Sequence, residues 1–286
     1  MNSLTRLYDF YNEKLKNADP RVENWLMMQS YGPTLCVVST YLIVATVGPI
    51  IMANRKPVNV QLPMLAYNFG LVLLSLYMLY EFSVGMITAG YNYLCDNVDY
   101  SNDYNAIRLA SVCWWFYFSK FIDFFDTIFF ILRKKTQQVT FLHVYHHVTM
   151  PTLWWIGVKW VPGGQSCFCA TINCFVHVIM YSYYFLSGLG PSVQKYLWWK
   201  KYVTTLQLVQ FGIIFALSFY AYYRADELNC SYPQGLLLAN VIYQCTLLML
   251  FSHFFVKTYL LPSGRPKKTS TSQAVANGEP IKLKEN

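Results

Sequence analysis

The chain is poor in charged residues and in histidine. Of its 286 residues, 13% are charged, 55% are hydrophobic, and only five are histidines. Soluble globular domains carry roughly 25% charged residues, so this deficit excludes an ordinary soluble domain. The first 21 residues are polar and mixed in charge, which predicts no removable signal peptide. No internal repeat is visible, and this argues against a transporter built from inverted repeats.

The hydrophobic residues lie in long runs, as expected for an all-α polytopic membrane protein. Seven transmembrane helices are predicted, near residues 32–53, 63–88, 110–132, 141–160, 166–187, 203–223 and 235–259. We therefore expect an N-terminal segment (1–31), a seven-helix membrane domain (32–260) and a tail (261–286). The tail is rich in Ser, Thr, Gly and Lys, which predicts disorder.

Basic residues gather in alternate loops and predict the orientation of the chain. They follow the first, third, fifth and seventh spans: Arg55, Lys56, Arg133, Lys134, Lys135, Lys195, Lys200, Lys201, Lys257, Arg265, Lys267 and Lys268. The positive-inside rule then places the C-terminus in the cytosol and the N-terminus on the opposite side. The net charge of +8 accordingly indicates a membrane face and an anionic ligand rather than nucleic acid.

Two cysteines lie in loops on the predicted non-cytosolic side, where disulfides are permitted. These are Cys95 and Cys230, and we expect them to form a disulfide that joins the loops after the second and sixth spans. Cys167 and Cys169 lie near the same side and could compete. The cysteines do not predict a zinc site, because only one close pair is present.

Three of the five histidines form an H-x-x-H-H motif at the start of the fourth span. These are His143, His146 and His147, which fall on one face of a helix. Ionisable groups inside a membrane are costly and usually functional, so this motif is the leading candidate for an active site. The alternative is a set of hydrogen-bonded structural histidines. The lone His253 in the seventh span fits that alternative, as a satisfied interior residue.

Further polar residues follow helical spacing in three other spans. The third span carries Lys120, Asp123, Asp126 and Thr127; the fifth carries Asn173, His177, Tyr181 and Tyr184; the sixth carries Thr204, Gln207 and Gln210. Lys120 and Asp123 are three residues apart and can form an ion pair, which could serve helix packing rather than chemistry. The fifth-span residues share one face, so His177 can meet the histidine motif across a cavity.

Two chemistries use clustered histidines in membranes. A di-iron centre commonly needs eight or more histidines in several motifs, so five histidines and one motif argue against it. The other chemistry is acid–base or nucleophilic catalysis by neutral imidazole, the form that burial favours. Imidazole can attack a thioester and leaves an acyl group that is still activated.

The polar motifs together resemble those of the very-long-chain fatty-acid elongases. Lys120 to Thr127 resembles the K-x-x-[ED]-x-x-D-T motif, QVTFLHVYHH ending at His147 resembles the histidine box, and NCFVHVIMYSYY and TTLQLVQ resemble the two motifs that follow. WWIGVKW and QKYLWWKKY are most similar to the elongase-4 type. Three positions depart from the usual pattern: Asp123 stands for Glu, Cys174 for Ser or Thr, and Phe185 for a smaller residue that would leave the tunnel wider.

The resemblance implies a fold and a reaction. Six helices would form an inverted barrel around an acyl tunnel closed on the lumenal side, with the first helix packed outside. The enzyme would be a 3-oxoacyl-CoA synthase that condenses acyl-CoA with malonyl-CoA, without a metal or redox cofactor. A ketoacyl-CoA reductase, a dehydratase and an enoyl-CoA reductase would be its partners in the endoplasmic reticulum, and it could form homo- or hetero-oligomers. Lys282 and Lys284 match a dilysine retrieval signal of that membrane, although such lysines also occur in solvated tails.

The resemblance also suggests roles for the polar residues. His146 would accept the acyl group, with His177 as its proton partner and with His143 and His147 orienting the site. Asn173 and Gln210 would stabilise oxyanions. The expected substrate-binding residues are Lys120, Asp123, Asp126, Arg133, Lys134, Tyr181, Tyr184, Lys200, Lys201, Gln207 and Lys257. A seven-helix receptor is the rival from another class, but the D-R-Y and N-P-x-x-Y signatures are missing from the sequence.

Overall fold

A computed structural model describes residues 3–261, and these residues form helices and loops without a strand. The helices are α1 (Ser3–Lys16), α2 (Gly32–Met52), α3 (Gln61–Ala89), α4 (Tyr104–Ile122), α5 (Phe124–Leu132), α6 (Phe141–Trp160), α7 (Gln165–Gly188), α8 (Pro191–Gln194), α9 (Lys200–Tyr223) and α10 (Gln234–Phe255). A π-helical turn extends α10 to Leu260. Helices α2, α3, α7, α9 and the extended α10 are long and apolar enough to cross a membrane. The prediction of an all-helical, multi-pass membrane protein is therefore confirmed.

The third predicted span is not one helix, which corrects the expectation for residues 110–132. It begins earlier, at Tyr104, and breaks at Asp123 into α4 and α5. The amide of Asp126 donates to the Asp123 carbonyl at 3.1 Å, a tight turn rather than a full helical repeat. The hydroxyl of Tyr67 on α3 donates to the Ile122 carbonyl at 3.2 Å and satisfies an acceptor at the break.

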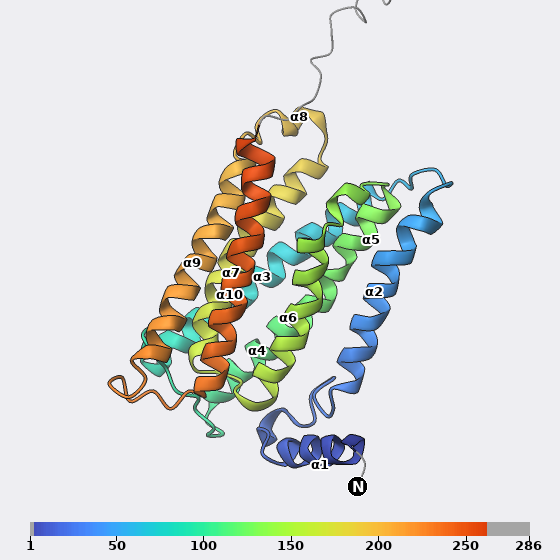
Figure 1. Ribbon diagram of the computed structural model, residues 1–286. Helices are drawn as coiled ribbons and strands as arrows, with labels where there is room; N and C mark the ends of the chain where they lie inside the picture. The colour runs from blue at the N-terminus through green and yellow to red at the C-terminus, as the bar shows by residue number, and fades with distance from the viewer. Residues whose placement is uncertain (1–2, 262–286) are drawn as a thin grey trace, which may run out of the picture.

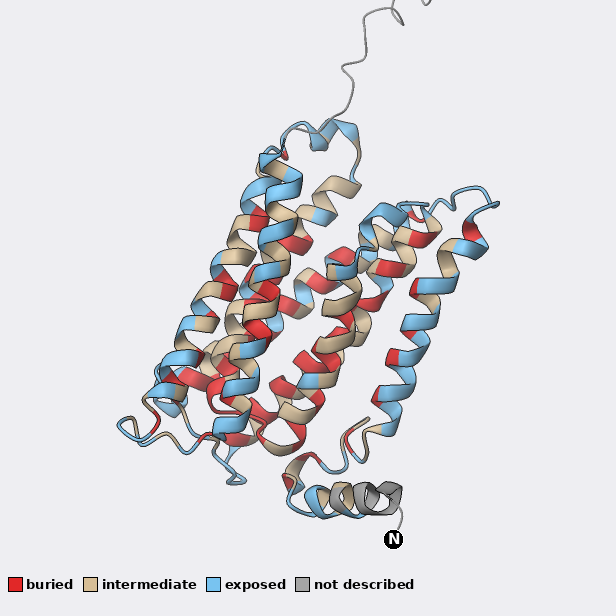
Figure 2. Ribbon diagram, viewed as in Figure 1, coloured by how far each residue is buried: buried red, intermediate tan, exposed pale blue. Residues whose placement is uncertain are grey.

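The long helices run side by side, with their outer faces exposed and their inner faces buried (Figure 1, Figure 2). Helix α3 packs on α7 and α4, α4 packs on α6, α10 packs on α9, and α9 packs on α7; α6 and α10 also touch. Helix α2 lies to one side and contacts α5 and α6. We call the end with loops 53–60, 133–140 and 189–199 the basic end. The opposite end, crossed by α1, is the disulfide end.

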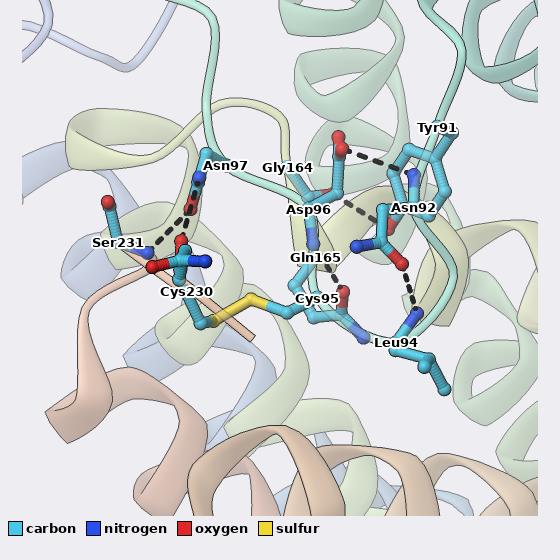
Figure 3. The surroundings of a disulfide bond; sticks show 11 residues. Tyr91, Asn92, Leu94, Cys95, Asp96, Asn97, Gly164, Gln165, Cys230 and Ser231 are labelled. Atoms are coloured by element: carbon cyan, nitrogen blue, oxygen red, sulfur yellow. Dashed lines mark hydrogen bonds between the residues drawn. A yellow bond between two sulfur atoms is a disulfide. The ribbon is translucent and has the colours of Figure 1, made fainter. Parts of the chain in front are cut away.

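The disulfide end is tied together by covalent and hydrogen bonds (Figure 3). Cys95 and Cys230 form the disulfide expected from the sequence. The Gln165 side-chain oxygen accepts from the Asp96 backbone amide, and the Gln165 backbone amide donates to the Asp96 backbone carbonyl, both at 3.0 Å. Gly164 has a φ of 55°, and a Cβ there would lie 2.9 Å from the Asp96 carbonyl oxygen, so only glycine fits. Burial raises the pKa of Asp96 above its usual value.

Candidate active site

A largely apolar cavity of about 190 Å³ lies among five helices. Helices α4, α6, α7, α9 and α10 contribute to its wall, and Tyr232 lines it near the disulfide end. His146 is the histidine of the motif that lines it. Asn173 from α7 and Gln210 from α9 line the same cavity, so three predicted catalytic residues are brought together from three helices.

Several carboxamide side chains in this wall have oxygens without a hydrogen-bond partner in the described chain. The side-chain oxygens of Asn173, Gln210 and Gln244 have no hydrogen-bond partner among the described residues, although all three residues are more than nine-tenths buried. Buried polar groups are normally paired, so these oxygens are available to water or to a bound molecule. Sequence reasoning missed Gln244. Its spacing from Asn240, i to i+4 within an apolar helix, was the available signal, and its amide donates to Asn240 at 3.2 Å.

The histidine motif is divided between two surroundings. Thr140 caps the start of α6, and its hydroxyl accepts from the His143 amide. The His143 Nε2 lies 2.7 Å from the Thr127 hydroxyl, a hydrogen bond that fixes this ring against α5. The His147 ring is buried beside Tyr41 of α2 and Phe124 of α5. His146 thus faces the cavity, while its two companions pack toward α2 and α5.

A buried ion pair lies near His177. Lys120 Nζ is 3.4 Å from Asp123 Oδ2, which confirms the predicted pairing, and both side chains are at most 5% exposed. The Tyr181 hydroxyl lies 3.0 Å from Asp123 and 3.2 Å from Asp126, so it can donate to either carboxylate. The rings of His177 and Tyr181 are 5.4 Å apart. His177 lies within electrostatic range of both Lys120 and His146.

This arrangement can be compared with known proteins. The sequence matches the ELO: GNS1/SUR4 family over residues 26–268. The chain belongs to this family. It is 47% identical over 281 residues to very long chain fatty acid elongase 4 of Homo sapiens, covering 96% of this chain and 87% of that protein. It is also 47% identical over 264 residues to very long chain fatty acid elongase 7 of Rattus norvegicus, covering 92% and 93%. The family resemblance read from the motifs is confirmed.

The three residues that depart from the elongase pattern lie in different surroundings. Asp123 keeps its contact with Lys120 despite its shorter side chain. Cys174, on α7, is buried in the hydrophobic core of the protein. The ring of Phe185 packs on Phe69 of α3, with centroids 5.7 Å apart, so it meets a neighbouring helix.

The predicted substrate-binding residues at the basic end do not gather in one cavity as His146, Asn173 and Gln210 do. The Arg133 guanidinium lies 3.0 Å from the Met64 sulfur, and Lys134 Nζ donates to the carbonyls of Ala53 and Arg55. The other members are exposed or half-buried: Tyr184, Lys200, Lys201, Gln207 and Lys257. His253 is exposed on α10, so the expectation of an interior residue is wrong. Lys282 and Lys284 lie outside the described residues.

Within residues 3–261, no three His, Cys, Asp or Glu side chains gather as a metal site would require. The residues near the cavity are instead one histidine, several carboxamides and apolar groups. Such a wall can hold an alkyl chain, present a nucleophilic nitrogen and donate hydrogen bonds to an oxyanion.

Proposed function

We propose that the protein is a condensing enzyme of microsomal fatty-acid elongation. It would convert acyl-CoA and malonyl-CoA to 3-oxoacyl-CoA, CoA and CO₂, acting on long and very long saturated or polyunsaturated chains. The observation that carries the proposal is His146 in the wall of an apolar cavity beside Asn173 and Gln210. The names of the relatives, very long chain fatty acid elongases 4 and 7, support it.

The proposed architecture is an inverted barrel of six helices around an acyl tunnel. The packing pairs α3–α4, α4–α6, α6–α10, α10–α9, α9–α7 and α7–α3 form a closed circuit, which supports this arrangement. Helix α2 contacts only α5 and α6 among the more extensive helix pairs of the described chain, as expected for a helix outside the barrel. The break at Asp123 lets α4 and α5 together serve as one span.

His146 would attack the thioester carbonyl of acyl-CoA. The C–S bond breaks, a C–N bond forms, and the imidazole proton passes to the leaving thiolate, with His177 as the proton carrier. Asn173 and Gln210 would hold the oxyanion. Malonyl-CoA would then lose CO₂, and the resulting carbanion would form the new C–C bond as the imidazole leaves and takes up a proton from water by way of His177.

His143 and His147 would position this reaction rather than touch the substrate. The Thr127–His143 bond of 2.7 Å fixes one ring, and packing against Tyr41 fixes the other. The CoA phosphates would bind at the basic end, where Lys200, Lys201 and Lys257 are exposed and carry positive charge. This end would face the cytosol, in the membrane of the endoplasmic reticulum, with the disulfide end in the lumen.

The test uses the purified full chain in detergent with acyl-CoA and labelled malonyl-CoA. We expect a two-carbon extension, abolished in His146→Ala but nearly unchanged in His253→Ala, whose histidine is exposed on α10. With acyl-CoA alone, we expect stoichiometric CoA release and an acyl adduct on a histidine. Activity with both substrates, but neither CoA release nor adduct with acyl-CoA alone, would indicate a ternary complex and a general-base role instead.

A further inference from the structure

We propose that the seam between α6 and α10 is a lateral portal. The distal part of a long acyl chain would leave the cavity there and lie in the bilayer, so that the barrel does not limit chain length. The inference rests on the proposed function, because it assigns the cavity to an acyl chain.

The cavity is too short for a very long chain. Its wall on α6 runs from His146 to Gly157, and on α10 from Leu247 to Leu236. Eleven residues at 1.5 Å per residue span about 16 Å. An extended chain advances roughly 1.2 Å per bond, so this depth holds about 13 bonds. Beyond it lies the closed disulfide end, where Gln165 is buried and bonded to Asp96.

Hydrogen bonds between α6 and α10 set the register of the two helices. Two hydrogen bonds join these helices in the described chain: Tyr145 to Thr246 and Thr149 to Tyr243, both at 2.9 Å. The helices are antiparallel, so the same register continued by one and two turns sets Leu153 opposite Ala239 and Gly157 opposite Gly235.

These next two turns offer small residues and open space. Leu153 lines the cavity and is 38% exposed, and Ala239 also lines the cavity and is exposed. A Cβ added to Gly157 or to Gly235 would meet no atom within 4 Å. These residues mark the stretch of the seam, between the second hydrogen bond and the disulfide end, where the proposed portal lies.

The chemistry of this opening suits a hydrocarbon. Its rim is apolar, and in a membrane its outer side faces lipid tails, which are as apolar as leucine. Methylene groups that pass from the cavity into the bilayer lose no apolar contact with their surroundings. The buried polar groups at the disulfide end offer no such passage.

The experiment fills the portal and compares chain lengths. Gly235→Trp, at the seam but outside the cavity wall, is assayed with saturated acyl-CoA of roughly 12 and roughly 22 carbons, which bracket the estimated depth. We expect the long substrate to lose at least roughly tenfold in kcat/KM, since tenfold corresponds to the binding of only about two methylenes. The short substrate should change less than about twofold. Gly212→Trp is the matched control, because this glycine of α9 also has open space around it and does not line the cavity.

A second variant avoids any effect of tryptophan on folding. Gly235→Cys is purified, modified with a bulky maleimide after folding, and compared with the equally treated parent protein. Selective loss of the long substrate supports the portal. Equal loss of both substrates, or full activity on the long one in the filled variants, would overturn it. A parent protein that extends neither substrate would refute the proposed function instead.

Discussion

Replacing Lys120 by methionine should destabilise the protein strongly. The side chain is 2% exposed, its ammonium lies 3.4 Å from Asp123, and it sits 4.2 Å from the centre of the Phe116 ring. Methionine keeps the length and apolar stem but removes the charge. The Asp123 carboxylate then stays buried, with the Tyr181 hydroxyl as its remaining polar contact from a side chain. Breaking a buried pair in this way costs about 3–5 kcal/mol.

A double variant separates the charge from the packing. In Lys120→Met with Asp123→Asn, neither position 120 nor position 123 carries a charge, and the amide oxygen still accepts from Tyr181. Replacing both members of a buried pair is often nearly neutral, so most of the stability should return. Activity need not return with it. Recovery of stability without activity would show that the charges serve the reaction, whereas recovery of both would make the pair a packing device.

Thermal unfolding in detergent measures the effect. A loss of about 3–5 kcal/mol corresponds to a Tm roughly 6–15 °C below that of the parent protein. The reasoning would be refuted if Lys120→Met melted within about 2 °C of the parent, a shift of roughly 1 kcal/mol or less. It would equally fail if the double variant melted as low as the single one.

Three further outcomes are expected. Serine at Cys95 and Cys230 should lower stability by about 5 kcal/mol, because the bond closes a loop with a sequence separation of 135, and melting with and without reductant checks this. Burial raises the pKa of Asp96 above 3.8, so the folded chain binds protons more readily and loses stability as pH rises through that pKa. Asp96→Asn should therefore melt higher than the parent at neutral pH and equally in acid; identical pH slopes would contradict this. Deleting the last five residues, which include Lys282 and Lys284, should let protein leave the endoplasmic reticulum, as microscopy would show.

The sequence predicts α2, α3, α7, α9 and α10 well because each is a long apolar run, and a run of that length has few alternatives in a membrane. The break at Asp123 escapes such an analysis, since hydropathy treats residues 110–132 as continuous. At the break, Tyr67 donates to the Ile122 carbonyl from a helix distant in sequence. Periodicity could not find it.

The candidate site shows the same limit. Motif spacing brings His146, Asn173 and Gln210 to one cavity, because each motif repeats at helical intervals. Gln244 was missed, and His253 was misplaced to the interior, because both lie on α10 outside any recognised motif. Which face of that helix turns inward is decided by its packing on α9 and α6, and its own sequence is apolar nearly all round.

The disulfide has a mechanical consequence for the far side of the molecule. It fastens the loop between α3 and α4 to the loop between α9 and α10, so four helices meet at one fixed junction. Helices held at one end move by pivoting there. Helix α9 has 24 residues and is about 36 Å long, so a tilt of roughly 5° swings its opposite end by about 3 Å. With one end fixed by the disulfide, a small tilt of these helices would widen the basic end while the disulfide end keeps its shape.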